Sequence, residues 1–517
     1  MGGDERRRRW ALVALLGLLA TALRSIGLAA PWGADNFGTA GAFFSIAARN
    51  YFRYGYVATH GVPVVTAEGP PSPAVYYTHH PPLFELLVSA SFRLFGEHEW
   101  AARLVPLVFS LVALGLLVHL AARAFGWRVA LLTLAIAATL PLDAHLAAHV
   151  DVQGSVLLAL VLATLACVMH RRYGAAIACF TLAAAVDWPA LYLPVLLALA
   201  PWPFDFPRPR RFVAGLLAYG AVLFVALSAW TSDLGSIVAL LHGRALSFAS
   251  DTGVPFDLGG WFRVVVGTYL WELCTPLALV AVVVWCVWRV PTLVRTPHPE
   301  RLALLLLLFG LAHLIVGFQG AYQHEFWTTY LRAAVPLVCA LLLDRVAGHA
   351  PGGWRRTVVV AGLALTIVPG LAGTLRLAVS PLSARPLGGY APRDLADAIR
   401  SCTPAGAGAL TSDYSGESAI FYYANRPLGI GIVDVDALEE RLVERRYDPP
   451  GGSADPYLVP TARPACFVLP LLHVRYFPAL TAHLRSRYQG RRAGAFEIFS
   501  LRAPGSLEAG GSRPSAG

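Results

Sequence analysis

Ionisable side chains are sparse in this chain, and several of them stand at the ends of apolar segments. Asp35 follows the first apolar segment, in the run WGADN, and Arg24 lies inside that segment. A carboxylate in this setting acts as a general base or binds a cation, and the alternative is a solvated loop aspartate. Arg24 neutralises Asp35 or a phosphate group, or it extends its guanidinium outward to water.

Two adjacent histidines form a second candidate group. His79 and His80 precede Pro81 and Pro82, whose restricted backbone angles hold the chain extended before the next helix. Rigidly held imidazoles are suited to contact a phosphate or to ligate a metal. A purely structural histidine pair is the alternative.

Acidic and imidazole groups also gather between two later apolar segments, where Asp143, His145, His149 and Asp151 follow one another closely. Carboxylate and imidazole are both ligands of divalent ions, so Asp35, His149 and Asp151 are the candidate metal ligands. The spacing matches no closed metal motif, and support of a catalytic base is the alternative role. The sequence requires no cofactor, and a divalent metal stays open.

The run QHEFWTTYLR supplies a fourth group, which contains His324, Tyr330 and Arg332. Arginine is suited to hold phosphate through paired hydrogen bonds. Helix capping explains His324 equally well. Arg244, in an earlier loop, is a further candidate for a phosphate contact.

The composition indicates the class of protein that carries these groups. Of the 517 residues, 56% are hydrophobic and 14% are charged, and the mean hydropathy is +0.57. Soluble proteins carry roughly 25% charged residues, so this chain is expected in a membrane. All 41 basic residues are arginines, grouped in short connections, which argues against nucleic-acid binding. No P-loop or dinucleotide fingerprint occurs, so ATP and NAD are not expected ligands.

Apolar runs of bilayer length predict about eleven transmembrane helices. The loop at 31–99 holds two amphipathic, aromatic-rich segments, GAFFSIAARNYFRYGY and PPLFELLVSASFRLFG, which we expect to lie flat at the membrane interface. A second loop, about 231–264, has similar character. The predicted spans lie near 10–30, 100–122, 127–142, 152–169, 174–187, 189–203, 212–230, 265–288, 302–318, 331–347 and 357–376.

Arginines are concentrated in alternate connections, which the positive-inside rule assigns to the cytoplasm. With an odd number of spans, the C-terminal region is then expected outside the cytoplasm, in a protein of the inner or plasma membrane. A cleavable signal peptide is the alternative for the first span, although its apolar run is long for one. The predicted divisions are 1–9 as a cytoplasmic N-terminus, 10–376 as a transmembrane domain, 385–505 as an extracytoplasmic domain and 506–517 as a disordered tail.

The polar C-terminal region predicts a small α/β domain, because helical and strand patterns alternate along it. The segments PRDLADAIRSC, ESAIFYYANR and HVRYFPALTAHLRSRY are typical of helices, whereas GALTSD, LGIGIV, ACFVLP and AFEIFSL are typical of strands. Cys402 and Cys466 are the cysteine pair of this region, and a disulfide between them is reasonable outside the cytoplasm.

The acid after the first span and the segment that runs from HPPLFELL to LAARAFG resemble the GT-C superfamily of integral-membrane glycosyltransferases. The likeness is to the bacterial branch related to protein O-mannosyltransferases and lipid A aminoarabinose transferases, and it covers roughly residues 10–376. The run QHEFWTTYLRAAVPL is similar to the histidine- and tyrosine-rich outer turn of that branch.

The resemblance implies transfer of a sugar, with inversion, from a polyprenyl phosphate to a lipid, glycan or protein acceptor on the outer face. Asp35 takes the place of the first-loop acid and Asp151 that of the second acid, whereas Asn36 replaces the usual partner of the first. His80 occupies a position where some relatives have a basic phosphate contact. The candidate donor-binding set is Arg24, His79, His80, Arg244, His324, Tyr330 and Arg332.

Two other classes stay open. A transporter is expected to contain inverted repeats, and the sequence shows none, while most ionisable groups lie toward one face. A catalytically inactive relative would act as a scaffold through its outer domain.

Overall fold

The computed structural model describes residues 3–65, 76–77, 79–152, 154–231, 257–379, 390–404, 406–413, 417–444 and 463–501. The chain forms two compact units. Unit 1 comprises Met1–Ala30 and Thr78–Leu382, and unit 2 comprises Pro31–Tyr77 and Ser383–Gly517. Most of the predicted first outer loop therefore packs with the C-terminal residues, although the sequence places it with the transmembrane segments.

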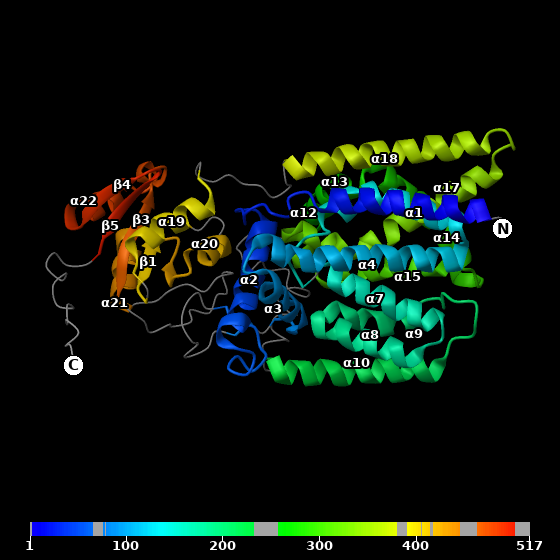
Figure 1. Ribbon diagram of the computed structural model, residues 1–517, viewed down its shortest axis with the longest axis horizontal. Helices are drawn as coiled ribbons and strands as arrows, with labels where there is room; N and C mark the ends of the chain where they lie inside the picture. Colours follow the sequence, from blue (N-terminus) through cyan, green and yellow to red (C-terminus); the bar gives the residue numbers. More distant parts are fainter. Residues whose placement is uncertain are drawn as a thin grey trace. The chain divides into compact units, whose positions relative to one another are not determined.

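Unit 1 is helical, and the axes of its long helices are roughly parallel (Figure 1). Apolar residues occupy all sides of these helices, because the segments are buried by neighbouring helices or exposed to hydrocarbon. The elements are α1 Gly3–Arg24, α3 Leu83–Phe95, α4 Glu99–Phe125, α5 Trp127–Thr139, α6 Pro141–His145, α7 Ser155–Met169, α8 Tyr173–Val186, η1 Trp188–Leu191, α9 Tyr192–Leu199, α10 Arg210–Thr231, α12 Leu258–Trp261, η3 Phe262–Leu270, α13 Trp271–Cys274, α14 Pro276–Arg295, α15 Arg301–Val316, α16 Phe318–Gln323, η4 Glu325–Arg332, α17 Ala334–His349 and α18 Arg355–Val379.

Among the described residues, four helices are long and apolar enough to cross a membrane, namely α4, α10, α14 and α18. The bent pair formed by η4 and α17 passes the same test as a fifth span. The other predicted spans coincide with α1 and with shorter apolar helices such as α7 and α15. A helical, multi-pass fold is thus confirmed, while the count of eleven spans stays a prediction.

One predicted span, at 265–288, is interrupted, and another break falls between the predicted spans 174–187 and 189–203; each break has a local cause. The segment at 265–288 breaks at Thr275, which has a φ of 64° directly before Pro276. The backbone of Asp187 is extended, so α8 ends there and a 3₁₀ turn begins at Trp188. The side chain of Asp187 caps that turn by accepting a hydrogen bond from the Trp188 N–H.

Unit 2 contains a five-stranded sheet in the order β2-β1-β3-β5-β4, in which β1 lies parallel to β2 and β3. The pairs β3–β5 and β5–β4 are antiparallel. The sequence predicted the small α/β domain but missed α21 and β4. The elements are α2 Asn36–Tyr54, α19 Pro392–Cys402, β1 Gly408–Thr411, α20 Glu417–Ala424, β2 Leu428–Gly429, α21 Val435–Glu444, β3 Pro464–Pro470, η5 His473–Arg475, α22 Pro478–Arg487, β4 Gln489–Ala493 and β5 Phe496–Ser500.

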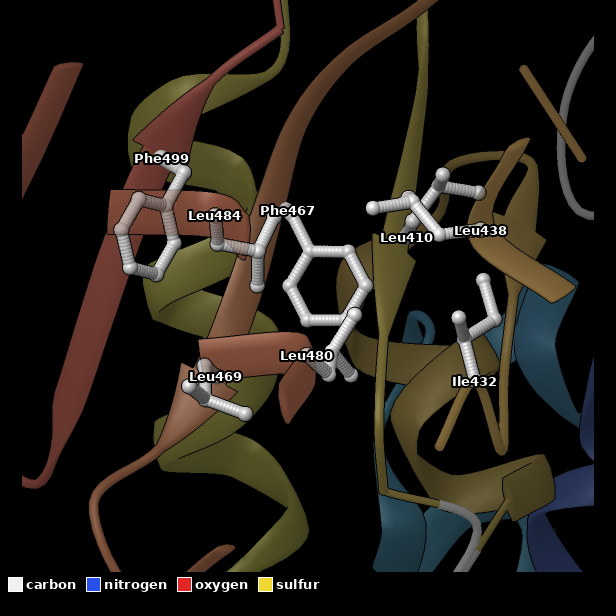
Figure 2. Close-up of a cluster of buried hydrophobic side chains, with 8 residues drawn as sticks. All are labelled: Leu410, Ile432, Leu438, Phe467, Leu469, Leu480, Leu484 and Phe499. Atoms are coloured by element: carbon white, nitrogen blue, oxygen red, sulfur yellow. The ribbon is translucent and has the colours of Figure 1, made fainter. Parts of the chain in front are cut away.

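Alternation along β3 determines which helix covers which face of the sheet. Phe467 and Leu469 point into one cluster with Leu480 and Leu484 of α22 (Figure 2). Cys466 therefore points to the opposite face, and there it forms a disulfide with Cys402 of α19. The sheet is enclosed by α22 on one face and by α19 on the other.

The disulfide is expected to stabilise this domain. It joins residues 64 positions apart, so the cross-link restricts a long loop in the unfolded chain, and its removal is expected to cost about 2–5 kcal/mol. Thermal unfolding of the purified full-length chain with Cys402→Ser and Cys466→Ser measures this loss. The control is Cys286→Ser, which removes a free thiol. Equal midpoints for the two proteins would contradict the prediction.

Candidate active site

Asp35 lies at the first turn of α2, in unit 2. Its Oδ1 accepts a hydrogen bond of 2.7 Å from the N–H of Gly38, so the carboxylate is the N-cap of the helix. The turn is tight, because a Cβ atom on Gly38 would lie 2.3 Å from the backbone of Gly33. Glycine at these positions is what allows the chain to turn and fix the carboxylate at the start of the helix.

In unit 1 the double-proline segment brings His80 against Asp187. The Nδ1 atom of His80 lies 2.7 Å from the Oδ1 atom of Asp187, and both side chains are largely buried. The neighbouring indole of Trp188 donates to the carbonyl oxygen of His79 at 2.7 Å. The break between α8 and η1 thus fixes the backbone at His79 and the imidazole of His80.

Burial and neighbouring charges change the ionisation of two groups in the predicted first outer loop. Burial, the largest single effect, lowers the pKa of His80, but the acidic groups of Asp187, Asp151 and Glu85 together outweigh it, so the pKa of His80 is raised above 6.5. Burial raises the pKa of Glu85, on the first turn of α3, to about 8. The imidazole therefore holds its proton to a higher pH than a free histidine does, and at neutral pH the Glu85 carboxyl favours its neutral form.

Several fully buried polar atoms near His80 have no hydrogen-bond partner among the described residues. They include both carboxyl oxygens of Glu85, Oδ2 of Asp187, both ring nitrogens of His313 and the hydroxyl of Tyr330. Because such atoms cost free energy unless they are paired, their convergence indicates a place where a polar ligand binds. We call His80, Glu85, Asp151, Asp187, His313 and Tyr330 the polar cluster.

Electrostatic interactions and ring contacts link the members of the polar cluster. His80 interacts electrostatically with Glu85 and Asp151 as well as with its partner Asp187. Tyr330 interacts with Asp151 and with Asp187. The ring of His313 meets the Tyr330 ring edge-on, with centroids 4.7 Å apart. Residues from the double-proline segment and from five further parts of unit 1 therefore surround one polar region.

An aromatic layer supports the cluster from α15 and η4. The ring of His313 stacks on Trp327 with centroids 4.4 Å apart. The indole of Trp327 fits there because Gly317 and Gly320 have no side chains, since a Cβ on either would lie 1.6 or 2.1 Å from it. Tyr330 also packs against Phe309, which holds its hydroxyl in place. These contacts restrict the orientation of the histidine and the tyrosine.

The three candidate metal ligands are divided between the units, with Asp35 in unit 2 and His149 and Asp151 in unit 1. The Nε2 atom of His149 lies 3.6 Å from the Oδ2 atom of Asp151, and Phe326 lies beside both His149 and His324. In the part of the chain that the structure describes, no three His, Cys, Asp or Glu side chains are arranged to hold a metal ion. A divalent metal stays a prediction, and no step is assigned to one.

Arg24 and Arg332 form a separate buried group around Asp143. Nη2 of Arg24 and Nε of Arg332 each lie 3.4 Å from Oδ1 of Asp143. The hydroxyl of Ser110 accepts from both guanidinium groups, at 3.2 and 2.9 Å, and Ser155 accepts from Arg332 at 2.8 Å. All three charged side chains are at most 5% exposed. Their donors are directed to protein acceptors.

The structure thus brings three predicted residues together, namely His80, Asp151 and Tyr330, and adds three that the sequence analysis missed. Glu85, Asp187 and His313 each interrupt a long apolar run, and this interruption was the available signal. Asp35 lies in unit 2, and the candidate phosphate contact Arg244 lies outside the described residues.

Comparisons with known proteins bear on what this arrangement does. The profile of the dolichyl-phosphate-mannose-protein mannosyltransferase family matches residues 79–243, which include His80, Asp151 and Asp187. ArnT from Cupriavidus metallidurans in the apo state has the same fold, with a TM-score of 0.57 and 17% identity over 96% of this chain and 98% of that one. The expected resemblance to the GT-C glycosyltransferases is confirmed.

Two further solved structures share this fold. ArnT from Cupriavidus metallidurans bound to undecaprenyl phosphate matches with a TM-score of 0.55 and 18% identity, over 95% of this chain and 97% of that one. The apo oligosaccharyltransferase of Archaeoglobus fulgidus matches with a TM-score of 0.53 and 12% identity, over 83% of this chain and 65% of that one. None of the curated proteins matches this chain by sequence.

The ion pair of His80 and Asp187 is expected to make the stability of this chain depend on pH. Because folding raises the pKa of His80, the pair stabilises the fold fully below the unfolded value of 6.5, and the contribution is lost as pH rises through the folded pKa. The thermal midpoint of wild type minus that of His80→Gln is therefore expected to shrink as pH rises. A difference that grows with pH would refute the pairing.

Asp143 is expected to be essential for stability. Asp143→Asn leaves two buried guanidinium groups without a charge partner, which is expected to cost about 3–5 kcal/mol. Thermal unfolding in detergent measures this loss. The matched control is Glu497→Gln, which breaks an ion pair with Arg485 outside unit 1 and is expected to cost less than about 1 kcal/mol, because Arg485 is half exposed. Similar losses of stability in Asp143→Asn and Glu497→Gln would contradict the prediction that Asp143 is essential.

Proposed function

We propose that this chain is a membrane glycosyltransferase that moves a sugar, with inversion, from a polyprenyl phosphate to an acceptor on the outer face of the membrane. The polar cluster carries this proposal, because unpartnered donors and acceptors converge inside an otherwise apolar helical unit. The fold supports it, since ArnT, whose fold this chain shares over nearly its whole length, has been solved with undecaprenyl phosphate bound.

In this proposal the donor binds at the polar cluster. Protonated His80 balances the charge of the phosphate, and Asp187 keeps the imidazole charged through the hydrogen bond at Nδ1. Glu85 and Tyr330 hydrogen-bond hydroxyl groups of the sugar, which is a hexose or a pentose. His79, His324 and Arg244 are further proposed contacts of the phosphate. The isoprenoid tail remains in hydrocarbon. Because the phosphate link already activates the sugar, the donor needs no nucleotide site.

We propose Asp35 as the general base. Its carboxylate takes the proton of an acceptor hydroxyl while the acceptor oxygen bonds to the anomeric carbon. The bond from that carbon to the phosphate oxygen breaks, and the electron pair leaves with the polyprenyl phosphate, whose charge His80 stabilises. Attack from the face opposite the phosphate inverts the anomeric configuration. Asp151 is the second proposed acid and supports the charge of His80.

For Arg24 and Arg332 we propose a structural role in place of the phosphate contact that the sequence suggested. Their guanidinium groups already bind Asp143, Ser110 and Ser155, so a phosphate would have to replace buried hydrogen bonds.

The proposal also places the protein in a membrane, and two other functions stay open to test. We propose that the protein resides in the inner or plasma membrane with residues 385–505 outside the cytoplasm, where a lipid, glycan or protein acceptor binds. A transporter would move a substrate without cleaving it, and an inactive relative would bind donor without turnover. Release of polyprenyl phosphate from a panel of polyprenyl-phosphate sugars separates this enzyme from both.

Asp35→Asn is expected to reduce sugar transfer by at least about 100-fold, because asparagine accepts no proton. Asparagine is as good an N-cap as aspartate, so the hydrogen bond to Gly38 and the fold should persist. The measurement is the initial rate of transfer by purified protein reconstituted in liposomes.

The matched control is Asp257→Asn. Asp257 also caps a helix, by accepting from the N–H of Gly260 at 2.6 Å, and it has no proposed role in catalysis. We expect this variant to transfer sugar at close to the wild-type rate. An Asp35→Asn protein that does the same would remove Asp35 from the mechanism.

A further inference from the structure

The turn that carries Asp35 is bound by helix α20 of the C-terminal domain. The backbone N–H of Trp32 donates to the hydroxyl of Tyr423 at 2.7 Å. Trp32 is only 2% exposed, and its indole meets the ring of Tyr422 edge-on, with centroids 6.3 Å apart. Two adjacent tyrosines of α20 therefore contact a residue that precedes Asp35 by three positions.

Trp32 and Asp35 belong to one rigid segment. The indole of Trp32 lies against α2 at Gly41, where a Cβ atom would be 2.3 Å from the ring. Asp35 is bonded to the same helix through Gly38, and Gly38 touches the backbone of Gly33. Because these contacts leave no room for independent movement, a shift of Trp32 moves the carboxylate as well.

The remainder of α2 is attached to the same helix α20. Nη1 of Arg49 donates to the carbonyl oxygen of Tyr422 at 2.9 Å, and its guanidinium lies over the Tyr422 ring, 5.1 Å from the centroid. Arg49 is 3% exposed. Farther along, Nη1 of Arg53 donates to Oδ1 of Asn425 at 3.1 Å. The contact of α2 with the C-terminal domain thus extends from Trp32 to Arg53.

We propose that Tyr423 is a positioning residue for Asp35, and that the C-terminal domain serves to hold the general base in place. This inference rests on the proposed function for the role of Asp35, whereas the anchoring itself does not. A general base acts only within hydrogen-bond reach of the proton that it takes, and small misplacements of catalytic groups reduce rates by about 10- to 100-fold.

The alternative is that α20 only adds stability to unit 2. In that case the loss of the Tyr423 hydroxyl would lower the unfolding midpoint without affecting catalysis selectively. A test must therefore detect local release of the turn and a loss that depends on Asp35, in the intact chain.

The first arm measures hydrogen–deuterium exchange of residues 32–41 in the full-length protein. Tyr423→Phe keeps the ring but removes the acceptor of the Trp32 N–H, so we expect exchange in this segment to rise about 10-fold. The control is Tyr476→Phe, which removes the hydroxyl of an exposed tyrosine of the same domain. Unchanged exchange in Tyr423→Phe would overturn the anchor, whether or not the protein transfers sugar.

The second arm measures kcat with an undecaprenyl-phosphate sugar and the affinity for undecaprenyl phosphate alone. We expect Tyr423→Phe to lower kcat about 10-fold with unchanged affinity, and to cause no further loss in an Asp35→Asn background. Losses that multiply in the double variant would overturn the positioning role. If the wild type transfers no sugar from any donor, the proposed function fails, and the exchange measurement still decides the anchor.

Discussion

Every charged group that this chain buries among its apolar helices needs a partner. The carboxylate of Asp143 meets this constraint by lying between Arg24 and Arg332. Because α1 supplies Arg24, α6 supplies Asp143 and η4 supplies Arg332, the three charges connect segments that are far apart in sequence. The serine hydroxyls of α4 and α7 accept further hydrogen bonds from the guanidinium groups. Burial makes removal of one partner costly, so the cluster fixes the mutual arrangement of these helices.

The same element η4 carries Tyr330 and Trp327, which form one side of the polar cluster. The group of Arg24, Asp143 and Arg332 and the proposed donor site are therefore connected through η4. The chemistry of the two sites differs. In the first, the hydrogen-bonding capacity of the guanidinium groups is met by protein groups. In the second, buried carboxyl, hydroxyl and imidazole atoms lack partners among the described residues. Oδ2 of Asp143 also lacks a partner among the described residues, so the two groups differ mainly in how far their polar atoms are paired.

In unit 2 the surrounding structure fixes the position of a loop carboxylate, that of Asp35. Capping of α2, the close approach of Gly33 and Gly38, and the contacts of Trp32 with α20 all restrict Asp35. Loop residues gain a defined geometry only when neighbouring structure determines it, and here the neighbouring structure comes from the other end of the chain. The appended domain is in this way part of what defines the loop.

Composition and apolar periodicity determined the helical membrane fold, the approximate helix positions and the small C-terminal α/β domain, because burial in hydrocarbon constrains every residue of a segment. Spacing alone also identified Asp35, His80, Asp151 and Tyr330 as candidates. Only the tertiary structure decided that Arg24 and Arg332 bind Asp143, that Asp187 pairs with His80, and that Trp32 bonds to Tyr423. These pairs are separated by about a hundred residues or more, and no local pattern records which distant partner neutralises a buried charge or accepts a buried hydrogen bond.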